Sequence, residues 1–148
     1  MTRVGTACVA GLTALATAVA GHAVEALADD EPSLGPGLVT VELDIRHSRF
    51  SADRLRVAEG TTVRFLVRND DPIAHELVVG DAALHRSHVR GTEAVHPPVP
   101  GEVSVGPGDT GLTVYEFDEP GVVTFACHLP RHLEYGMVGE VEVAPSSS

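Results

Sequence analysis

The sequence contains little sulfur, few aromatic residues and no lysine. Its 148 residues include two Cys, two Met, two Tyr, four Phe and no Trp. All ten basic residues are Arg, set against 21 Asp and Glu, which gives a formal net charge of -11. An acidic surface repels the phosphates of nucleic acid, so we expect no nucleic-acid partner. Cationic partners and small ligands remain open.

The rest of the composition is that of one globular domain. Hydrophobic residues make up 43% of the chain and charged residues 21%, which excludes both a disordered chain and a multi-span membrane protein. A length of 148 residues is sufficient for one well-developed core and too short for two. Eight His residues stand out against the scarcity of sulfur.

The N-terminal segment carries an export signature. Residues 4–20 are uncharged and follow Arg3. The expected cleavage site comes directly after Ala28, with the small residue Ala26 two positions earlier. This pattern predicts a secretory signal peptide over residues 1–28. A retained membrane anchor is the alternative, because about 17 apolar residues lie at the lower edge of what spans a bilayer. We expect an exported protein, located in the periplasm, outside the cell or at the outer face of the cell membrane.

Cleavage of this segment would leave one Cys, Cys127, and one Met, Met137. The net charge would stay at -11, because the segment carries one Arg and one Glu. In an oxidising compartment an unpaired thiol cannot form an internal disulfide, so metal ligation or catalysis would account for it. A buried Cys that acts only as a small apolar residue is the alternative.

Apolar and polar residues alternate with period two over residues 38–45 and 63–67, and further short apolar segments recur between turn signals, which together predict short strands. They span residues 38–45, 55–57, 63–67, 77–79, 102–105, 112–117, 122–127 and 138–143. Seven to eight strands predict an all-β fold, either a Greek-key β-sandwich or a small barrel. One short inserted helix is expected over residues 81–90, with Asp81 as its N-cap and Gly91 after its end. We expect a flexible acidic leader over residues 29–37, one domain over 38–144 and a tail over 145–148.

A candidate metal site lies near the C-terminus. Cys127, His132 and Met137 follow one another at spacings of five, in a loop between two predicted strands. A soft thiolate with imidazole selects copper, and two His with one Cys and a weak axial Met form the blue-copper electron-transfer site. The best candidate for the second imidazole is His75, which follows the turn at residues 69–74 and can reach this loop in a sandwich.

These motifs resemble those of the single-domain cupredoxins, the blue copper proteins of the plastocyanin, azurin and rusticyanin type. The resemblance rests on Cys127-x4-His132-x4-Met137 and on an upstream Asn-Asp-x4-His ending at His75. It implies a cupredoxin-like Greek-key sandwich and one type 1 copper ion with His75, Cys127 and His132 as equatorial ligands and Met137 as the axial one. It also implies one-electron transfer. The family often has Asn after its first His ligand; here Glu76 would alter the hydrogen bonds between the ligand loops.

The same motifs leave other functions open beside electron transfer. Copper binding for trafficking or storage is the main alternative, and a red-copper or enzymatic variant is a third. The last motif of the multicopper oxidases is also similar, but Ala126 stands where they have a His, and the chain has no His-x-His pair. We therefore expect no enzymatic activity.

We expect a monomer that exchanges electrons with a redox partner protein. A basic cytochrome fits best, because the net charge of -11 would steer it; acidity that serves only solubility is the alternative. Membrane contact is expected only if the N-terminal segment is retained. An apolar patch around His132, formed by Leu129, Pro130, Leu133 and Tyr135, is the expected docking surface.

The remaining histidines allow two interpretations. His85 and His88 are three residues apart on the predicted helix and His96 follows in the loop, so they form a candidate second, weaker site for copper or zinc. Alternatively they are exposed polar residues of an inserted helix. His128 should point to the strand face opposite Cys127, so we predict a surface residue without a ligand role.

Overall fold

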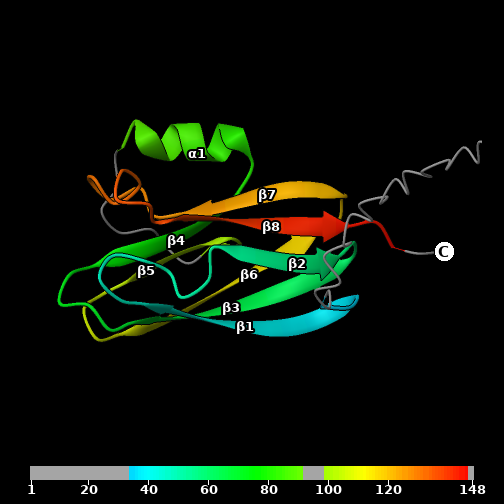
Figure 1. The fold of residues 1–148 in the computed structure, drawn as a ribbon, viewed down its shortest axis with the longest axis horizontal. Coiled ribbons are helices and arrows are strands. Elements are labelled where there is room, and N and C mark those ends of the chain that lie inside the picture. The colour runs from blue at the N-terminus through cyan, green and yellow to red at the C-terminus, as the bar shows by residue number, and fades with distance from the viewer. Residues whose placement is uncertain (1–33, 92–98, 147–148) are drawn as a thin grey trace, which may run out of the picture. The chain divides into compact units, whose positions relative to one another are not determined.

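The computed structural model describes residues 34–91 and 99–146. Eight strands and one helix are found there, namely β1 (Gly37–Ile45), β2 (Arg54–Ala58), β3 (Thr61–Asn69), β4 (His75–Gly80), α1 (Ala82–Val89), β5 (Glu102–Val105), β6 (Thr110–Phe117), β7 (Gly121–Ala126) and β8 (Val138–Ala144). The strands form two sheets, in the orders β1-β3-β6 and β2-β8-β7-β4-β5 (Figure 1). The predicted all-β sandwich with one short helix is confirmed.

The core lies between the two sheets and is built from alternating side chains. In β3, Val63, Phe65 and Val67 are fully buried, and in β8 Val141 and Val143 face the same core. Burying an aliphatic or aromatic side chain of this size contributes about 1.5–3 kcal/mol. The alternation therefore fixes which face of each strand is turned inward.

The chain crosses between the sheets repeatedly. β1, β3 and β6 lie in one sheet and the other five strands in the second. β2 separates β1 from β3 in the sequence but lies in the other sheet, and β1 pairs with β3 in parallel. β2 pairs in parallel with β8. β4 and β7 are antiparallel neighbours, with Val78 opposite Ala126 and Gly80 opposite Thr124. The first residue of β4 and the residue after β7 therefore lie at the same end of the sandwich.

The helix α1 covers the outer side of the five-stranded sheet (Figure 1). Asp81 caps it, because its side chain accepts a hydrogen bond of 2.8 Å from the N–H of Leu84. Gly91, at φ +54°, follows its end. Gly80 has no side chain where that of Leu84 lies, which lets the helix turn back closely onto β4. The helix thus lies within one residue of the predicted bounds at each end.

Backbone pairing begins before β1. The N–H of Leu34 donates to the carbonyl of Arg56, and its own carbonyl accepts from Ala58. The described end of the expected leader is therefore paired with the sheet. The predicted signal peptide over residues 1–28 lies outside the described residues. Within the described ranges, no helix has the length and apolar character that a bilayer span requires.

Candidate metal centre

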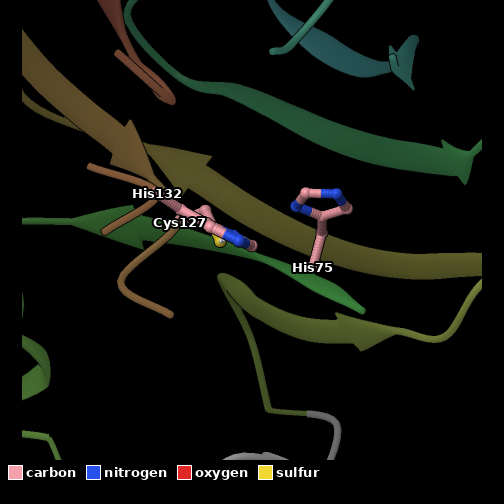
Figure 2. Close-up of side chains that lie close together, drawn as sticks. All are labelled: His75, Cys127 and His132. Carbon is pink, nitrogen blue, oxygen red and sulfur yellow. Dashed lines mark hydrogen bonds between the residues drawn. The ribbon is translucent and has the colours of Figure 1, made fainter. Parts of the chain in front are cut away.

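Three of the four predicted ligand residues meet at one end of the sandwich. His75 begins β4, Cys127 follows β7, and His132 lies in the loop between β7 and β8. One ligand atom from each lies within 4.8 Å of those of the other two, and all three residues are buried (Figure 2). Cys127 Sγ is 3.2 Å from His132 Nδ1, and the rings of His75 and His132 have centroids 4.7 Å apart.

The loop after β7 is held in place by its own backbone. The N–H of Cys127 donates to the carbonyl of Met137 at 3.1 Å, and the N–H of Met137 donates to the carbonyl of His132 at 3.1 Å. Gly136, at φ +88°, supplies a left-handed turn that a residue with a side chain rarely adopts. Met137 itself is fully buried. The loop therefore fixes the backbone positions of three predicted ligands relative to one another.

The orientation of His75 is set by Asp71. His75 Nε2 lies 3.0 Å from Asp71 Oδ2, so Nε2–H donates to the carboxylate. His75 Nδ1 is buried and has no hydrogen-bond partner among the described residues. A His whose one ring nitrogen is tied to a carboxylate and whose other nitrogen is unpaired has the arrangement of a metal ligand. Sequence reasoning missed Asp71, although it lies in the turn at residues 69–74 that precedes His75.

Burial also sets the protonation of the three residues. It lowers the pKa of His75, with Asp71 opposing, and it lowers the pKa of His132, helped by the nearby charge of His75. Burial raises the pKa of the Cys127 thiol to about 11, although backbone N–H groups of Glu76 and Leu129 favour the thiolate. The imidazoles are thus neutral at neutral pH, as ligation requires, and a metal ion must displace the thiol proton.

Glu76 and His128 join the two ligand segments. Glu76 is 2% exposed, and its Oε1 accepts a hydrogen bond of 2.7 Å from the backbone N–H of His128. The prediction that His128 is a surface residue is wrong. It is half-buried, because α1 covers its side of the sheet, and its Nε2 lies 2.8 Å from His85 Nδ1. The His128 side chain is not one of the three ligand residues that lie together at the end of the sandwich.

The donor set fits copper. It combines a thiol with two neutral imidazoles in a buried site, and one imidazole nitrogen is unpaired and buried there. Thiolate and imidazole together select copper over hard cations such as magnesium and calcium. Met137, the fourth predicted ligand, is buried at the end of the same loop, and its thioether would supply a further soft donor.

Comparison with known proteins places this site in a family. A family model for copper binding proteins, plastocyanin/azurin family, matches residues 38–144. The chain belongs to the plastocyanin/azurin family of copper-binding proteins. The predicted cupredoxin resemblance and the predicted copper cofactor are therefore confirmed.

Two sequence relatives share the name copper-resistant cuproprotein CopI. The protein of Rubrivivax gelatinosus is 39% identical over 99 residues, which cover 64% of this chain and 59% of the relative. This chain therefore spans little more than half of that relative's length. The protein of Pseudomonas aeruginosa is 26% identical over 139 residues, which cover 72% of this chain and 76% of the relative.

A solved structure confirms the cupredoxin fold. Reduced auracyanin from the photosynthetic bacterium Roseiflexus castenholzii superposes with a TM-score of 0.60 at 21% identity, covering 72% of this chain and 97% of auracyanin. At this identity the likeness concerns the fold alone. The fold of this plastocyanin/azurin family member thus has a counterpart in a solved structure.

Proposed function

We propose that this protein is a one-electron carrier with a single type 1 copper ion. His75, Cys127, His132 and Met137 would hold this ion. Copper held there would supply a Cu(II)/Cu(I) couple. The observation that carries the proposal is the buried cluster of one thiol and two imidazoles on a backbone-braced loop, the donor set of blue-copper electron-transfer sites.

The surroundings of the cluster suit electron transfer. Asp71 holds the ring of His75 through a hydrogen bond of 3.0 Å, and the backbone bonds between Cys127, His132 and Met137 hold the loop. Cys127 and His75 are 0% and 1% exposed, which keeps water away from them. Ligands held in this way rearrange little when the charge of a bound ion changes, which favours fast exchange.

An exit path for the electron runs through His132. It is 9% exposed and so is the most accessible residue of the cluster. Of the expected patch, Pro130, Leu133 and Tyr135 are exposed next to His132 in the loop, whereas Leu129 is partly buried because it packs against the core. Exposed apolar side chains next to a buried redox site fit a partner that docks briefly over His132.

The substitution Leu133→Arg tests this path. A charge in the patch must be desolvated when a partner docks, so we expect electron self-exchange to slow by at least about tenfold, or 1.4 kcal/mol. The copper absorption band should not change. Val122→Arg is the matched control, because Val122 is an exposed aliphatic residue of β7 on a strand end remote from the loop. Equal rates in the two variants would contradict the proposal.

Copper trafficking or storage is the second candidate function. It is favoured by the relatives named copper-resistant cuproprotein. A mediated redox titration distinguishes the two functions. A reversible one-electron couple supports the carrier, whereas the absence of a couple together with ready transfer of Cu(I) to a chelator supports storage.

We further propose that the protein works outside the cytoplasm, as a monomer without enzymatic activity, and that its partner is a basic redox protein such as a cytochrome. The export signature supports the location, and the net charge of -11 supports the basic partner. Steering by charge weakens with salt, so the association rate with a basic cytochrome should fall as ionic strength rises. A flat profile would contradict steering.

A further inference from the structure

A second group of histidines lies outside the His75–Cys127–His132 cluster, between α1 and β7. His85 and His88 come from α1, and His128 follows Cys127 directly. The ring of His128 has its centroid 5.1 Å from that of His85 and 5.6 Å from that of His88. The closest ring nitrogens are His85 Nδ1 and His128 Nε2, which are 2.8 Å apart.

The hydrogen bonds of His85 determine which of its nitrogens is available. Its Nε2 lies 3.1 Å from the carbonyl oxygen of Thr124, which only accepts, so Nε2 carries the ring proton. Nδ1 of the neutral ring therefore presents a lone pair toward His128. In a typical ligating His, one ring nitrogen donates its proton to a backbone carbonyl or a carboxylate, and the other ring nitrogen binds the ion.

His88 is already used within the fold. Its Nδ1 lies 3.0 Å from the carbonyl oxygen of Leu84, and its Nε2 lies 3.3 Å from a carboxylate oxygen of Glu102. The second of these contacts ties α1 to β5. His88 therefore braces the helix, and the donor pair consists of His85 and His128.

The separation of the two donor atoms indicates the geometry of an ion between them. Two bonds of about 2.0 Å, typical of imidazole on a divalent metal, place the nitrogens about 2.8 Å apart when they meet at about 90°. A linear two-coordinate Cu(I) ion would need about 4 Å and a tetrahedral ion about 3.3 Å by the same arithmetic. The observed 2.8 Å is the length of the hydrogen bond between the two rings, so the rings must turn toward a common point before an ion binds. Adjacent positions of a tetragonal Cu(II) ion require the least change in the separation of the two nitrogens.

We propose that His85 Nδ1 and His128 Nε2 form a second copper site that binds Cu(II). The two imidazoles face a surface hollow that is also lined by Ala82, Val89, Thr124, Ala126, Leu133, Arg86 and Arg90. Its open side leaves room for water as the remaining ligands. An ion bound there takes the place of the hydrogen bond between the two nitrogens.

This site binds copper more weakly than the Cys127 cluster. The described residues place no third His, Cys, Asp or Glu ligand atom with the pair, and the guanidinium groups of Arg86 and Arg90 repel a cation. The first equivalent of copper therefore fills the Cys127 cluster and the second fills the His85–His128 pair. One peptide unit separates Cys127 from His128, so the two sites are joined through the backbone.

The test is a titration of the purified protein with a first and then a second equivalent of Cu(II), followed by electron paramagnetic resonance. We expect the second equivalent to add a signal with wide copper hyperfine splitting and coupling to two imidazole nitrogens. In His85→Asn this signal should be lost, with copper binding at least about tenfold weaker, while the signal of the first equivalent stays unchanged. His128→Asn should act alike, and the exposed His47→Asn should retain both signals.

Each other outcome overturns the second site. These outcomes are no second signal, a second signal retained in both His85→Asn and His128→Asn, or a second signal lost equally in His47→Asn. The electron-carrier proposal is tested separately, by the spectrum recorded after the first equivalent of Cu(II). That spectrum also shows whether each variant has folded.

Discussion

The substitution Asp71→Asn tests how much the fold and the site depend on one buried carboxylate. Asp71 accepts three hydrogen bonds, from the backbone N–H of His47 at 2.6 Å, from that of Ser48 at 2.7 Å and from His75 Nε2 at 3.0 Å. An amide has one acceptor oxygen, and its NH2 group would face at least one of these donors. The variant therefore leaves a buried N–H without an acceptor.

The expected loss of stability follows from these contacts. An unsatisfied buried donor costs about 1–3 kcal/mol. His47 and Ser48 both have φ +53°, which is a left-handed backbone conformation. This conformation costs about 1–2 kcal/mol per residue. The Asp71 carboxylate stabilises it by accepting hydrogen bonds from both backbone N–H groups. We expect the free energy of unfolding of the metal-free protein to fall by about 2–4 kcal/mol at neutral pH. Copper affinity should fall by about 10–100-fold, because the ring of His75 loses its anchor.

The pH dependence of this effect has a definite sign. Burial raises the pKa of Asp71, but the hydrogen bonds from Ser48, His47 and His75 outweigh it, so the folded-state pKa is below the usual value. A carboxyl group with a lowered folded-state pKa stabilises fully above its unfolded pKa of about 3.9. That contribution is lost as pH falls through the folded-state pKa. The difference between wild type and variant should therefore shrink in acid.

Urea unfolding followed by circular dichroism measures the difference. Asp70→Asn is the matched control, since Asp70 is the neighbouring residue and forms a largely exposed ion pair of 2.7 Å with Arg46. Such a pair contributes about 1 kcal/mol or less. Equal losses in Asp71→Asn and Asp70→Asn would refute the reasoning.

Three further predictions concern the thiol and the core. Cys127→Ser should remove the intense thiolate-to-copper band while the metal-free protein keeps its β-sheet circular dichroism; a retained band would assign it to another residue. The Cys127 thiol has a pKa of about 11, so copper uptake at neutral pH releases its proton. Apparent copper affinity should therefore rise about tenfold per pH unit between about pH 7 and 9. Competition titrations with a chelator, corrected for the chelator's own protonation, measure this affinity, and a constant value would contradict the prediction. Gly139→Ala would place a methyl group against the ring of Phe125 and 2.7 Å from the carbonyl oxygen of Asp53, so thermal unfolding should show a loss of at least about 1–3 kcal/mol. Gly35→Ala, which meets no atom within 4 Å, is the control, and equal losses in the two would contradict the packing argument.

Strands such as β3 and β8 could be predicted from sequence because one face of each is buried and the alternation shows it, whereas β4 is buried at every residue and shows no alternation in burial. The predicted strand over residues 38–45 corresponds to Gly37–Ile45, and that over 102–105 to Glu102–Val105. The parallel pairing of β1 with β3 and of β2 with β8 was not predicted. It depends on crossovers between sheets, which local periodicity does not encode.

The candidate site could also be predicted only in part from the sequence. The spacing of Cys127 and His132 lies within one loop, so sequence alone could place them together. Three features depend on packing between distant segments, and sequence reasoning missed them. These are the Asp71 carboxylate behind His75, the bond from His128 to Glu76, and the contact of His85 with His128. Alternation gave the direction of His128 but not the helix that covers it.

The most direct test of the central claim is the spectrum of the protein with one equivalent of Cu(II). A type 1 site at His75, Cys127 and His132 predicts an intense visible thiolate-to-copper band together with narrow copper hyperfine splitting in electron paramagnetic resonance. An ordinary pale Cu(II) spectrum with wide splitting, or binding of Cu(I) alone, would contradict the electron-carrier account.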